Sequence, residues 1–315
     1  MKGKLNMKKI ISLVLCFAMM FALAGVAFAT DAVQEKPYDN SEFYTEGEYT
    51  LHYRVYEPAN EVKNQILLVH GFCLSTVSLE GVAQQYQNEG YRVVLVDAPN
   101  FGYSSRETTS MQLVAREELI YSLMQSLGGT WIVGGHSMGG GIAINLACDY
   151  PETVTGLVLY APQTAMQATG IMATMSRSFL MQAMYTVILK VALKIPFLVE
   201  MLVAMSFSDN EYAKNYELTR ISAPLSLEGT GAGISIMASH ARGNDFEKLS
   251  TLDIPCVIIT AANDKVASAD NLSEIIGNAP EGTYTYEFSD GGHMMMEYYP
   301  EETANQTLAT IAKCK

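Results

Sequence analysis

The sequence predicts an α/β fold in which a mostly parallel sheet carries helices on both faces. Three observations support this prediction. Short, continuously apolar runs alternate with helical segments in the first half of the chain, the same alternation resumes from residue 251, and a methionine-rich helical stretch separates the two parts. Strands that are apolar along their whole length are typical of sheets buried on both faces, and such sheets are usually parallel.

The first part of the predicted core covers residues 47–162. Residues 48–56 alternate polar and apolar side chains, which indicates an edge strand or an opening hairpin. After it, compact apolar runs predict strands and the segments between them predict helices. The predicted strands are residues 65–69, 91–96, 131–133 and 154–160, and the predicted helices are residues 81–88, 109–127 and 139–149.

The second part of the core covers residues 251–315. It repeats the pattern with predicted strands at 256–260 and 283–288 and predicted helices at 270–276 and 301–312. The helical insertion between the two parts, residues 163–250, contains eight methionines and a helical run at 178–207 that only Pro196 breaks. A membrane span over residues 179–207 is disfavoured, because Lys190, Lys194 and Glu200 would each cost about 3 kcal/mol inside a bilayer.

The first 29 residues have the pattern of a secretory signal peptide. Four lysines precede an apolar run at 10–24, and the small residues Ala27 and Ala29 suit cleavage after Ala29. An uncleaved N-terminal anchor is the alternative, although the apolar run is short for a span. We therefore expect a secreted or extracytoplasmic protein with an N-terminal extension at residues 30–46 before the core.

The charge balance argues against nucleic-acid binding. Removal of the leader takes away four lysines and no acid, which leaves 16 basic and 33 acidic side chains and a net charge of −17. Such a surface repels phosphate backbones. Solubility alone also accounts for the acidity.

Four cysteines remain after the leader, namely Cys73, Cys148, Cys256 and Cys314. An exported protein can pair four cysteines in three ways. These four are scattered along a chain with ample core, and their spacing resembles no metal site. Free, core-packed thiols are the favoured interpretation, and the pairing stays open.

Ser137 is the candidate nucleophile. It lies in Gly135-His136-Ser137-Met138-Gly139, between a predicted strand and a predicted helix. A sharp strand-to-helix turn lifts the serine above the sheet, and glycines two residues before and after it prevent backbone collisions. A phosphate-binding glycine loop is the alternative, but the lysine that such a loop needs is missing.

The segment Gly135-His136-Ser137-Met138-Gly139-Gly140 resembles the nucleophile turn of the α/β-hydrolase superfamily, and in particular that of monoacylglycerol lipases and lysophospholipases. His70-Gly71-Phe72 resembles the oxyanion loop of that superfamily. The segment from Asp97 to Ser104 resembles its D-x-P-G-x-G-x-S turn, with Asn100 where glycine is usual. Asparagine tolerates left-handed conformations, so we expect the turn to form. The resemblance implies an eight-stranded, mostly parallel sheet and a helical lid, or cap, at residues 163–250.

A serine hydroxyl needs a base, and the base needs an orienting acid. Among five histidines, His293 follows the last predicted strand in a segment that resembles the family's histidine loop. Asp264 follows the strand at 256–260 and resembles the family's acid, which completes the chain order Ser137, Asp264, His293. Asp290 is a rival acid that more simply caps a turn. Asp97 is assigned to supporting the turn that it begins.

The resemblance places the oxyanion donors at the backbone N–H groups of Phe72 and Met138. We further expect Met294, His70 and His136 to line the substrate site. The triad supplies nucleophile, base and electrostatics, so neither an organic cofactor nor a metal is expected.

Methionines around the predicted triad and throughout the insertion favour an apolar acyl group on a small-molecule ester or lipid-like substrate. Core packing explains the same methionines equally well. We also expect transient contact with a membrane or micelle surface through the lid. Ester hydrolysis is the leading hypothesis. Amidase or aminopeptidase action, carbon-carbon bond hydrolysis, perhydrolase chemistry and a non-catalytic binding protein on this scaffold are the alternatives.

Overall fold

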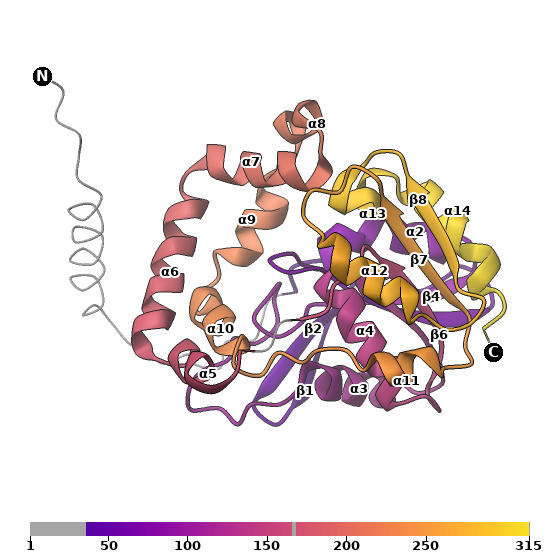
Figure 1. Cartoon of the computed structure of the whole chain (residues 1–315), viewed down its shortest axis with the longest axis horizontal. Coiled ribbons are helices and arrows are strands. Elements are labelled where there is room, and N and C mark those ends of the chain that lie inside the picture. Colours follow the sequence, from indigo (N-terminus) through magenta and orange to yellow (C-terminus); the bar gives the residue numbers. More distant parts are fainter. Residues whose placement is uncertain (1–35, 166–167, 315) are drawn as a thin grey trace, which may run out of the picture.

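One sheet occupies the centre of the molecule in the computed structural model, which describes residues 36–165 and 168–314 (Figure 1). Within these residues the sheet has eight strands in the order β1-β2-β4-β3-β5-β6-β7-β8. The strands are β1 (Ser41–Glu46), β2 (Tyr49–Tyr56), β3 (Asn64–Val69), β4 (Tyr91–Val96), β5 (Trp131–His136), β6 (Val154–Tyr160), β7 (Cys256–Ala261) and β8 (Tyr284–Phe288). Antiparallel pairing is confined to β1 with β2 and β2 with β4, so the predicted mostly parallel sheet is confirmed.

Helices cover both faces of the sheet. Consecutive residues of a strand point to opposite faces, so each strand contributes side chains to both helix layers. In β3, Leu67 and Val69 pack on one face with residues of α3 and α4. Ile66 and Leu68 pack on the other face with residues of α2 and α14. The core helices and turns are η1 (Thr76–Leu79), α2 (Glu80–Asn88), α3 (Arg116–Leu127), α4 (Met138–Asp149), α11 (Phe246–Ser250), α12 (Ala269–Gly277), η2 (Gly292–Met294), α13 (Met295–Tyr298) and α14 (Pro300–Ile311).

Two predicted boundaries are wrong. The core begins before residue 47, because β1 lies in the sheet and pairs with β2 from Ser41 opposite Arg54 onward. The helix predicted at 109–127 begins only at Arg116. The backbone N–H groups of Gln112 and Val114 donate to Glu48 and to the Tyr49 hydroxyl, so this stretch is bound to the β1–β2 hairpin and does not enter the helix.

Among the described residues, seven helices lie between β6 and β7, within the predicted insertion. The last of them, α11, packs on α4 of the core, and the six before it are grouped together. These six are α5 (Gly170–Ser176), α6 (Phe179–Leu193), α7 (Pro196–Phe207), α8 (Asn210–Asn215), α9 (Thr219–Leu225) and α10 (Thr230–Met237). The helical run breaks at Pro196 as predicted, with this proline in the first turn of α7. In Figure 1 these helices form a separate group beside the sheet, with α5, α6 and α7 on its outer side.

Cys73, Cys148, Cys256 and Cys314 are free thiols, which agrees with the favoured interpretation. Among residues 36–165 and 168–314, no helix is long and apolar enough to cross a membrane. The predicted leader at residues 1–29 lies outside the described residues.

Candidate active site

Ser137 occupies a strained turn between β5 and α4. Its backbone has φ 52° and ψ −116°, a conformation that side-chain-bearing residues rarely adopt. The Ser137 N–H donates to the Tyr160 carbonyl at 2.9 Å, and the Ser137 carbonyl accepts from the Gln163 N–H at 3.0 Å. Both partners come from the end of β6 and the residues just after it, so the neighbouring strand holds the turn in place.

The flanking glycines are required by close backbone contacts. A Cβ atom on Gly139 would lie 2.0 Å from the Val69 carbonyl oxygen and 2.7 Å from that of His70. A Cβ atom on Gly135 would lie 2.4 Å from the same Val69 oxygen. The start of α4 therefore packs directly on the end of β3, which brings the residues after Ser137 beside the loop that begins at His70.

Asp264 and His293 form a hydrogen-bonded pair. The His293 Nδ1 lies 2.7 Å from the Asp264 Oδ2, and both side chains are largely buried. The Asp264 Oδ1 accepts from the N–H groups of Val266 and Ala267. Burial alone raises the pKa of Asp264, but His293 and these N–H groups outweigh it and hold the pKa below its usual value. An ionised Asp264 keeps the proton on Nδ1 and leaves Nε2 of His293 as an acceptor.

His136 connects the nucleophile turn to the histidine loop. Its ring lies 4.5 Å from the His293 ring, and its Nε2 lies 2.9 Å from the His293 carbonyl oxygen. Burial, together with the nearby His293 ring, holds the pKa of His136 well below its ordinary value. A neutral ring that donates from Nε2 fits this contact. Residues 157 positions apart are thereby joined next to Ser137.

Two predicted substrate contacts do not fit the structure. His70 is fully buried, with Nδ1 at 2.7 Å from the Gly71 carbonyl and Nε2 accepting from the Ala98 N–H at 3.1 Å. His136 is 1% exposed and is held by the His293 carbonyl. Both rings hold backbone loops and offer a substrate no free surface. Met294, 2% exposed, packs in the core, and its contact with substrate stays a prediction.

Asn263 is a positioning residue that sequence reasoning missed. Its side-chain oxygen accepts from the Gly292 N–H at 2.9 Å, immediately before His293. Its carbonyl oxygen accepts from the Ser208 hydroxyl at 2.7 Å, at the end of α7. The adjacency of Asn263 to Asp264 was the only signal in the sequence. This residue links the acid loop, the histidine loop and the insertion.

The predicted oxyanion donors come from the residue after Ser137 and from the loop that follows β3. Within the described residues, the N–H groups of Phe72 and Met138 donate to no backbone or side-chain acceptor. Met138 begins α4, where N–H groups lack intrahelical partners. A Cβ atom on Gly71 would lie 2.5 Å from the His136 Nδ1, so the loop that carries Phe72 touches the residue before Ser137. The role of both N–H groups as oxyanion donors stays a prediction.

The turn that begins at Asp97 forms as expected. Buried Asp97 accepts from the N–H groups of Thr76 at 2.7 Å and Tyr103 at 2.9 Å, and its Oδ2 lies 2.7 Å from the His52 Nδ1. Asn100 adopts φ 76°, the left-handed conformation expected where the family has glycine. Asp97 therefore supports the loop packing and lies outside the His293–Asp264 pair.

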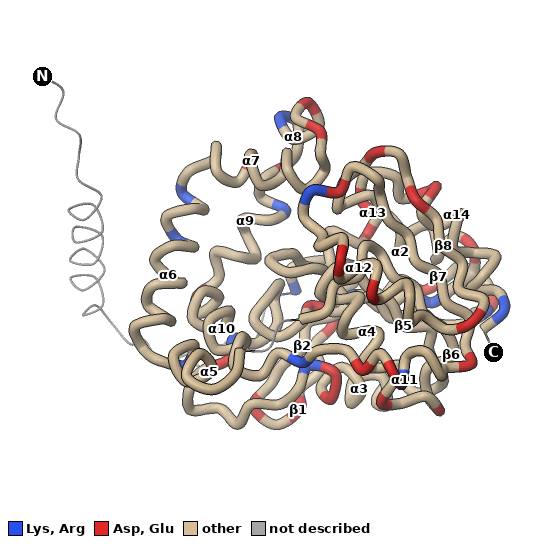
Figure 2. The backbone as a smooth tube through the Cα atoms, viewed as in Figure 1, with Lys and Arg blue, Asp and Glu red and all other residues tan. Residues whose placement is uncertain are grey.

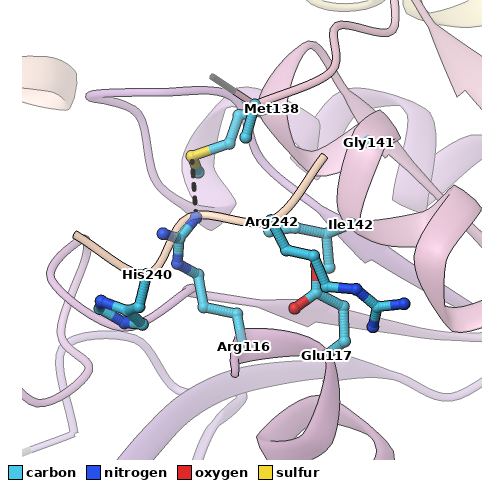
Figure 3. Close-up of a pocket in the computed structure, with 8 residues that line it drawn as sticks. Arg116, Glu117, Met138, Gly141, Ile142, His240 and Arg242 are labelled. Carbon is cyan, nitrogen blue, oxygen red and sulfur yellow. Dashed lines mark hydrogen bonds between the residues drawn. The ribbon is translucent and has the colours of Figure 1, made fainter. Parts of the chain in front are cut away.

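A small polar cavity is lined by Met138 and neighbouring side chains (Figure 3). Its volume is about 10 Å³, room for one water molecule, and its walls include Arg116, Glu117 and His240. The Arg116 guanidinium is buried and points at the Met138 sulfur, 3.8 Å away, while its Nε has no partner within the described residues. Burial lowers the pKa of Arg116, whereas the nearby Glu117 and Glu107 raise it. The Arg116 cation therefore contacts the side chain of Met138, whose backbone N–H group is a predicted oxyanion donor.

No group of three or more His, Cys, Asp or Glu side chains in residues 36–165 and 168–314 is arranged to hold a metal ion. Ser137 follows His136, the His136 ring contacts His293, and His293 is paired with Asp264. The model of the family described as the alpha/beta hydrolase fold matches residues 64–300. The chain belongs to the α/β-hydrolase family.

Other α/β-hydrolases resemble this chain in sequence and fold. Lipase 1 of Psychrobacter immobilis is 30% identical over 161 residues, 46% of this chain and 50% of that lipase, so the chain spans half of its length. The 2-hydroxy-6-oxononadienedioate/2-hydroxy-6-oxononatrienedioate hydrolase of Burkholderia vietnamiensis is 25% identical over 241 residues, 74% of this chain and 81% of that enzyme. The enol-lactonase of Burkholderia xenovorans LB400 superposes with a TM-score of 0.67 at 14% identity, covering 86% of this chain and all of that one. These likenesses agree with the family assignment and with the α/β-hydrolase fold.

Proposed function

We propose that this α/β-hydrolase is a secreted serine hydrolase that cleaves carboxylic esters through an acyl-enzyme intermediate. One observation carries the proposal: Ser137 has strained left-handed backbone angles at the β5–α4 turn, beside the hydrogen-bonded His293–Asp264 pair. Strain of about 1–3 kcal/mol at a single residue persists only where the surrounding structure enforces it. A serine held in this way next to a base-acid pair is the arrangement that acyl transfer needs.

The proposed reaction has two steps. The Ser137 Oγ attacks the ester carbonyl carbon while the Nε2 of His293 takes the hydroxyl proton, and the N–H groups of Phe72 and Met138 stabilise the oxyanion. His293 then protonates the leaving alcohol as the carbon-oxygen bond breaks. Water then attacks the acyl carbon while His293 accepts its proton, and His293 returns that proton to the Ser137 Oγ as the bond between acyl carbon and Oγ breaks and the acid leaves. Asp264 stabilises the imidazolium form of His293 in both steps.

The proposed substrate has an apolar acyl group. Met138 is 9% exposed, and Met294, Met295 and Met296 pack at the turn that carries the base. Thioether side chains adapt to irregular apolar shapes, so methionines around this turn are compatible with an acyl chain bound nearby. The alignment with Lipase 1 of Psychrobacter immobilis favours the same choice. The helices at α5–α10 are proposed to act as the lid of this site.

Carbon-carbon bond hydrolysis is the second candidate. The alignment with the 2-hydroxy-6-oxononadienedioate/2-hydroxy-6-oxononatrienedioate hydrolase covers 81% of that enzyme, more than the alignment with Lipase 1 covers of the lipase. The same serine, base and acid can serve that reaction. A vinylogous diketone acid tested beside the esters distinguishes the two candidates.

A fluorophosphonate probe and a series of nitrophenyl esters test the serine mechanism. We expect the wild type to be labelled and to hydrolyse butyrate to octanoate esters, and Ser137→Ala to lose both properties. Equal labelling of the two proteins would disprove the role of Ser137. Sequencing the N-terminus of protein from the culture medium tests secretion, and Thr30 is the expected first residue.

A further inference from the structure

The outer side of the insertion exposes many large apolar side chains. Twenty large hydrophobic residues are exposed in the described parts of the chain, and fourteen of them lie between residues 171 and 205. These fourteen residues, here called the outer apolar face, are Ile171, Met172, Met175, Phe179, Leu180, Met184, Tyr185, Ile188, Val191, Ile195, Phe197, Met201, Leu202 and Met205. Soluble proteins rarely expose a contiguous apolar patch of this kind without a partner.

Several members of the face follow helical spacing and form a stripe along their helix. On α6, Leu180, Met184, Ile188 and Val191 are three or four residues apart and 40–63% exposed. The opposite side of α6 packs on α10, where a Cβ on Gly231 would lie 2.5 Å from the Thr186 Cα. One side of α6 is therefore covered by α10, and the exposed stripe on its other side is not used to pack α6 on α10.

Helix α7 shows the same division. Val199, Val203 and Phe207 are buried, and they recur every four residues on the side that faces the core. Phe197 and Met201 recur every four residues on another side and are 68% and 49% exposed. A helix that is apolar on both sides normally lies inside a protein or in contact with lipid. We therefore expect the exposed apolar side of α7 to contact a partner.

The charge around this face differs from that of the whole chain. Residues 170–207 contain the cations Arg177, Lys190 and Lys194 and the single acid Glu200, whereas the full sequence carries a net charge of −13. Figure 2 shows basic positions (blue) along the backbone of α6 and mostly acidic positions (red) along the backbone around the sheet. A second copy of this acidic protein would meet repulsion beyond the face. The two exposed lysines at the C-terminal end of α6, Lys190 and Lys194, instead match anionic headgroups above acyl chains.

We propose that the outer apolar face of α5, α6 and α7 docks on the surface of an anionic lipid membrane. The helices lie in the interface, because none in the described residues is long and apolar enough to span a bilayer. The apolar side chains enter the acyl boundary while Lys190 and Lys194 contact phosphate groups. This interaction is separate from the proposed ester hydrolysis and does not require it.

Docking would place the lipid surface close to the predicted active site. A Cβ atom on Gly292 would lie 2.5 Å from the Ser206 carbonyl oxygen, and the Ser208 hydroxyl donates to the Asn263 carbonyl. The end of α7 thus touches both loops that carry the predicted base and acid. A membrane-bound α7 therefore presents those loops toward the lipid from which an apolar substrate would come.

Vesicle flotation of the Ser137→Ala protein tests the proposal without interference from hydrolysis. We expect binding to phosphatidylcholine vesicles that contain about 30% phosphatidylglycerol, and about tenfold weaker binding to pure phosphatidylcholine. Ile188→Asp/Phe197→Asp should abolish binding, and Lys190→Glu/Lys194→Glu should remove the preference for anionic vesicles. The matched controls are Ile276→Asp on α12, 41% exposed, and Lys63→Glu/Lys313→Glu.

The same substitutions in the protein with Ser137 should leave hydrolysis of a soluble acetate ester within about twofold of wild type. Loss of that activity would show that the variants are misfolded, and binding is then measured with the milder Ile188→Ser/Phe197→Ser. Equal binding of Ile188→Asp/Phe197→Asp and Ile276→Asp would overturn the proposal. A stable dimer in detergent-free buffer that Ile188→Asp/Phe197→Asp dissociates would also overturn it, because a second copy then covers the face.

Discussion

Helices α4 and α6 show how differently the core and the insertion treat apolar side chains. Of the twelve residues of α4, eleven are buried, and of the fifteen residues of α6, twelve of them apolar, none is buried. Helix α4 begins directly after Ser137, so burial on every side leaves that turn no alternative position. Helix α6 is held on one side only. Burial of α4 therefore fixes the position of the Ser137 turn, whereas α6 leaves apolar side chains exposed.

The largest expected effect comes from Asp264→Asn. The amide removes the charge that stabilises the His293 imidazolium and favours the wrong tautomer of the ring. We expect kcat for a soluble ester to fall about 10³- to 10⁴-fold, with unchanged thermal unfolding, as measured by stopped assays beside calorimetry. Asp290→Asn is the matched control, and a larger loss there than at Asp264 would identify Asp290 as the acid.

Gly139→Ala tests whether the core tolerates any movement at the α4 start. The new Cβ would meet backbone oxygens at 2.0 and 2.7 Å, which cannot rotate away. We expect the free energy of unfolding in urea to fall by about 3 kcal/mol and fluorophosphonate labelling to be lost. Gly277→Ala at the end of α12 is the control, since a Cβ atom at that position would have no neighbour within 4 Å. Similar stability of the two variants would contradict tight packing between α4 and β3.

Phe207→Ala and Met205→Ala test the two sides of α7. Phe207 is 1% exposed and packs among Tyr212, Tyr216 and Tyr298, whereas Met205 is 44% exposed. We expect Phe207→Ala to lower the free energy of unfolding by about 3 kcal/mol and Met205→Ala to change it by less than about 0.5 kcal/mol. Comparable losses would mean that the outer side of α7 is covered in solution.

Glu297 gives the contact between core and insertion a pH dependence. It accepts hydrogen bonds from Tyr216 at 2.9 Å and Arg220 at 3.3 Å, both in the insertion. Burial raises its pKa from 4.5 to about 7, although Arg220 and Tyr216 lower it. The folded chain therefore retains a proton that the unfolded chain releases between about pH 4.5 and 7. This group makes the free energy of unfolding fall by up to about 3 kcal/mol as pH rises through that window.

Glu297→Gln should remove this contribution. Urea unfolding of both proteins at pH 5, 6 and 7 measures it as the difference between two slopes, so that other titrating groups cancel. Parallel stability curves would show that Glu297 is already ionised at pH 5. Glu301→Gln, an exposed position in α14, is the control and should follow the wild type.

The elements that sequence reasoning predicted are those with a strong local signal. Apolar runs such as residues 91–96 predicted buried strands, and the glycines around Ser137 predicted the turn, because both depend on neighbours in the chain. The start of α3 was missed because contacts with the distant β1–β2 hairpin decide it. The strand β1 was missed although its partner β2 is its neighbour in the chain.

The site was predicted in the same uneven way. Its motif residues were found from the sequence, whereas Asn263 and the joining role of His136 depend on contacts across 29 and 157 positions. His70 was predicted to contact the substrate because its motif lies next to the site. The motif does not show the direction of the ring, which turns to the Gly71 carbonyl.

The separation of His136 and His293 along the chain determines when the contact between them can form during synthesis. A ribosome adds roughly 5–20 residues per second, so roughly 8–30 seconds separate the emergence of the two histidines. Throughout that interval the serine exists without its predicted base. Under the proposed mechanism, Ser137 therefore cannot hydrolyse esters inside the producing cell until synthesis has passed His293.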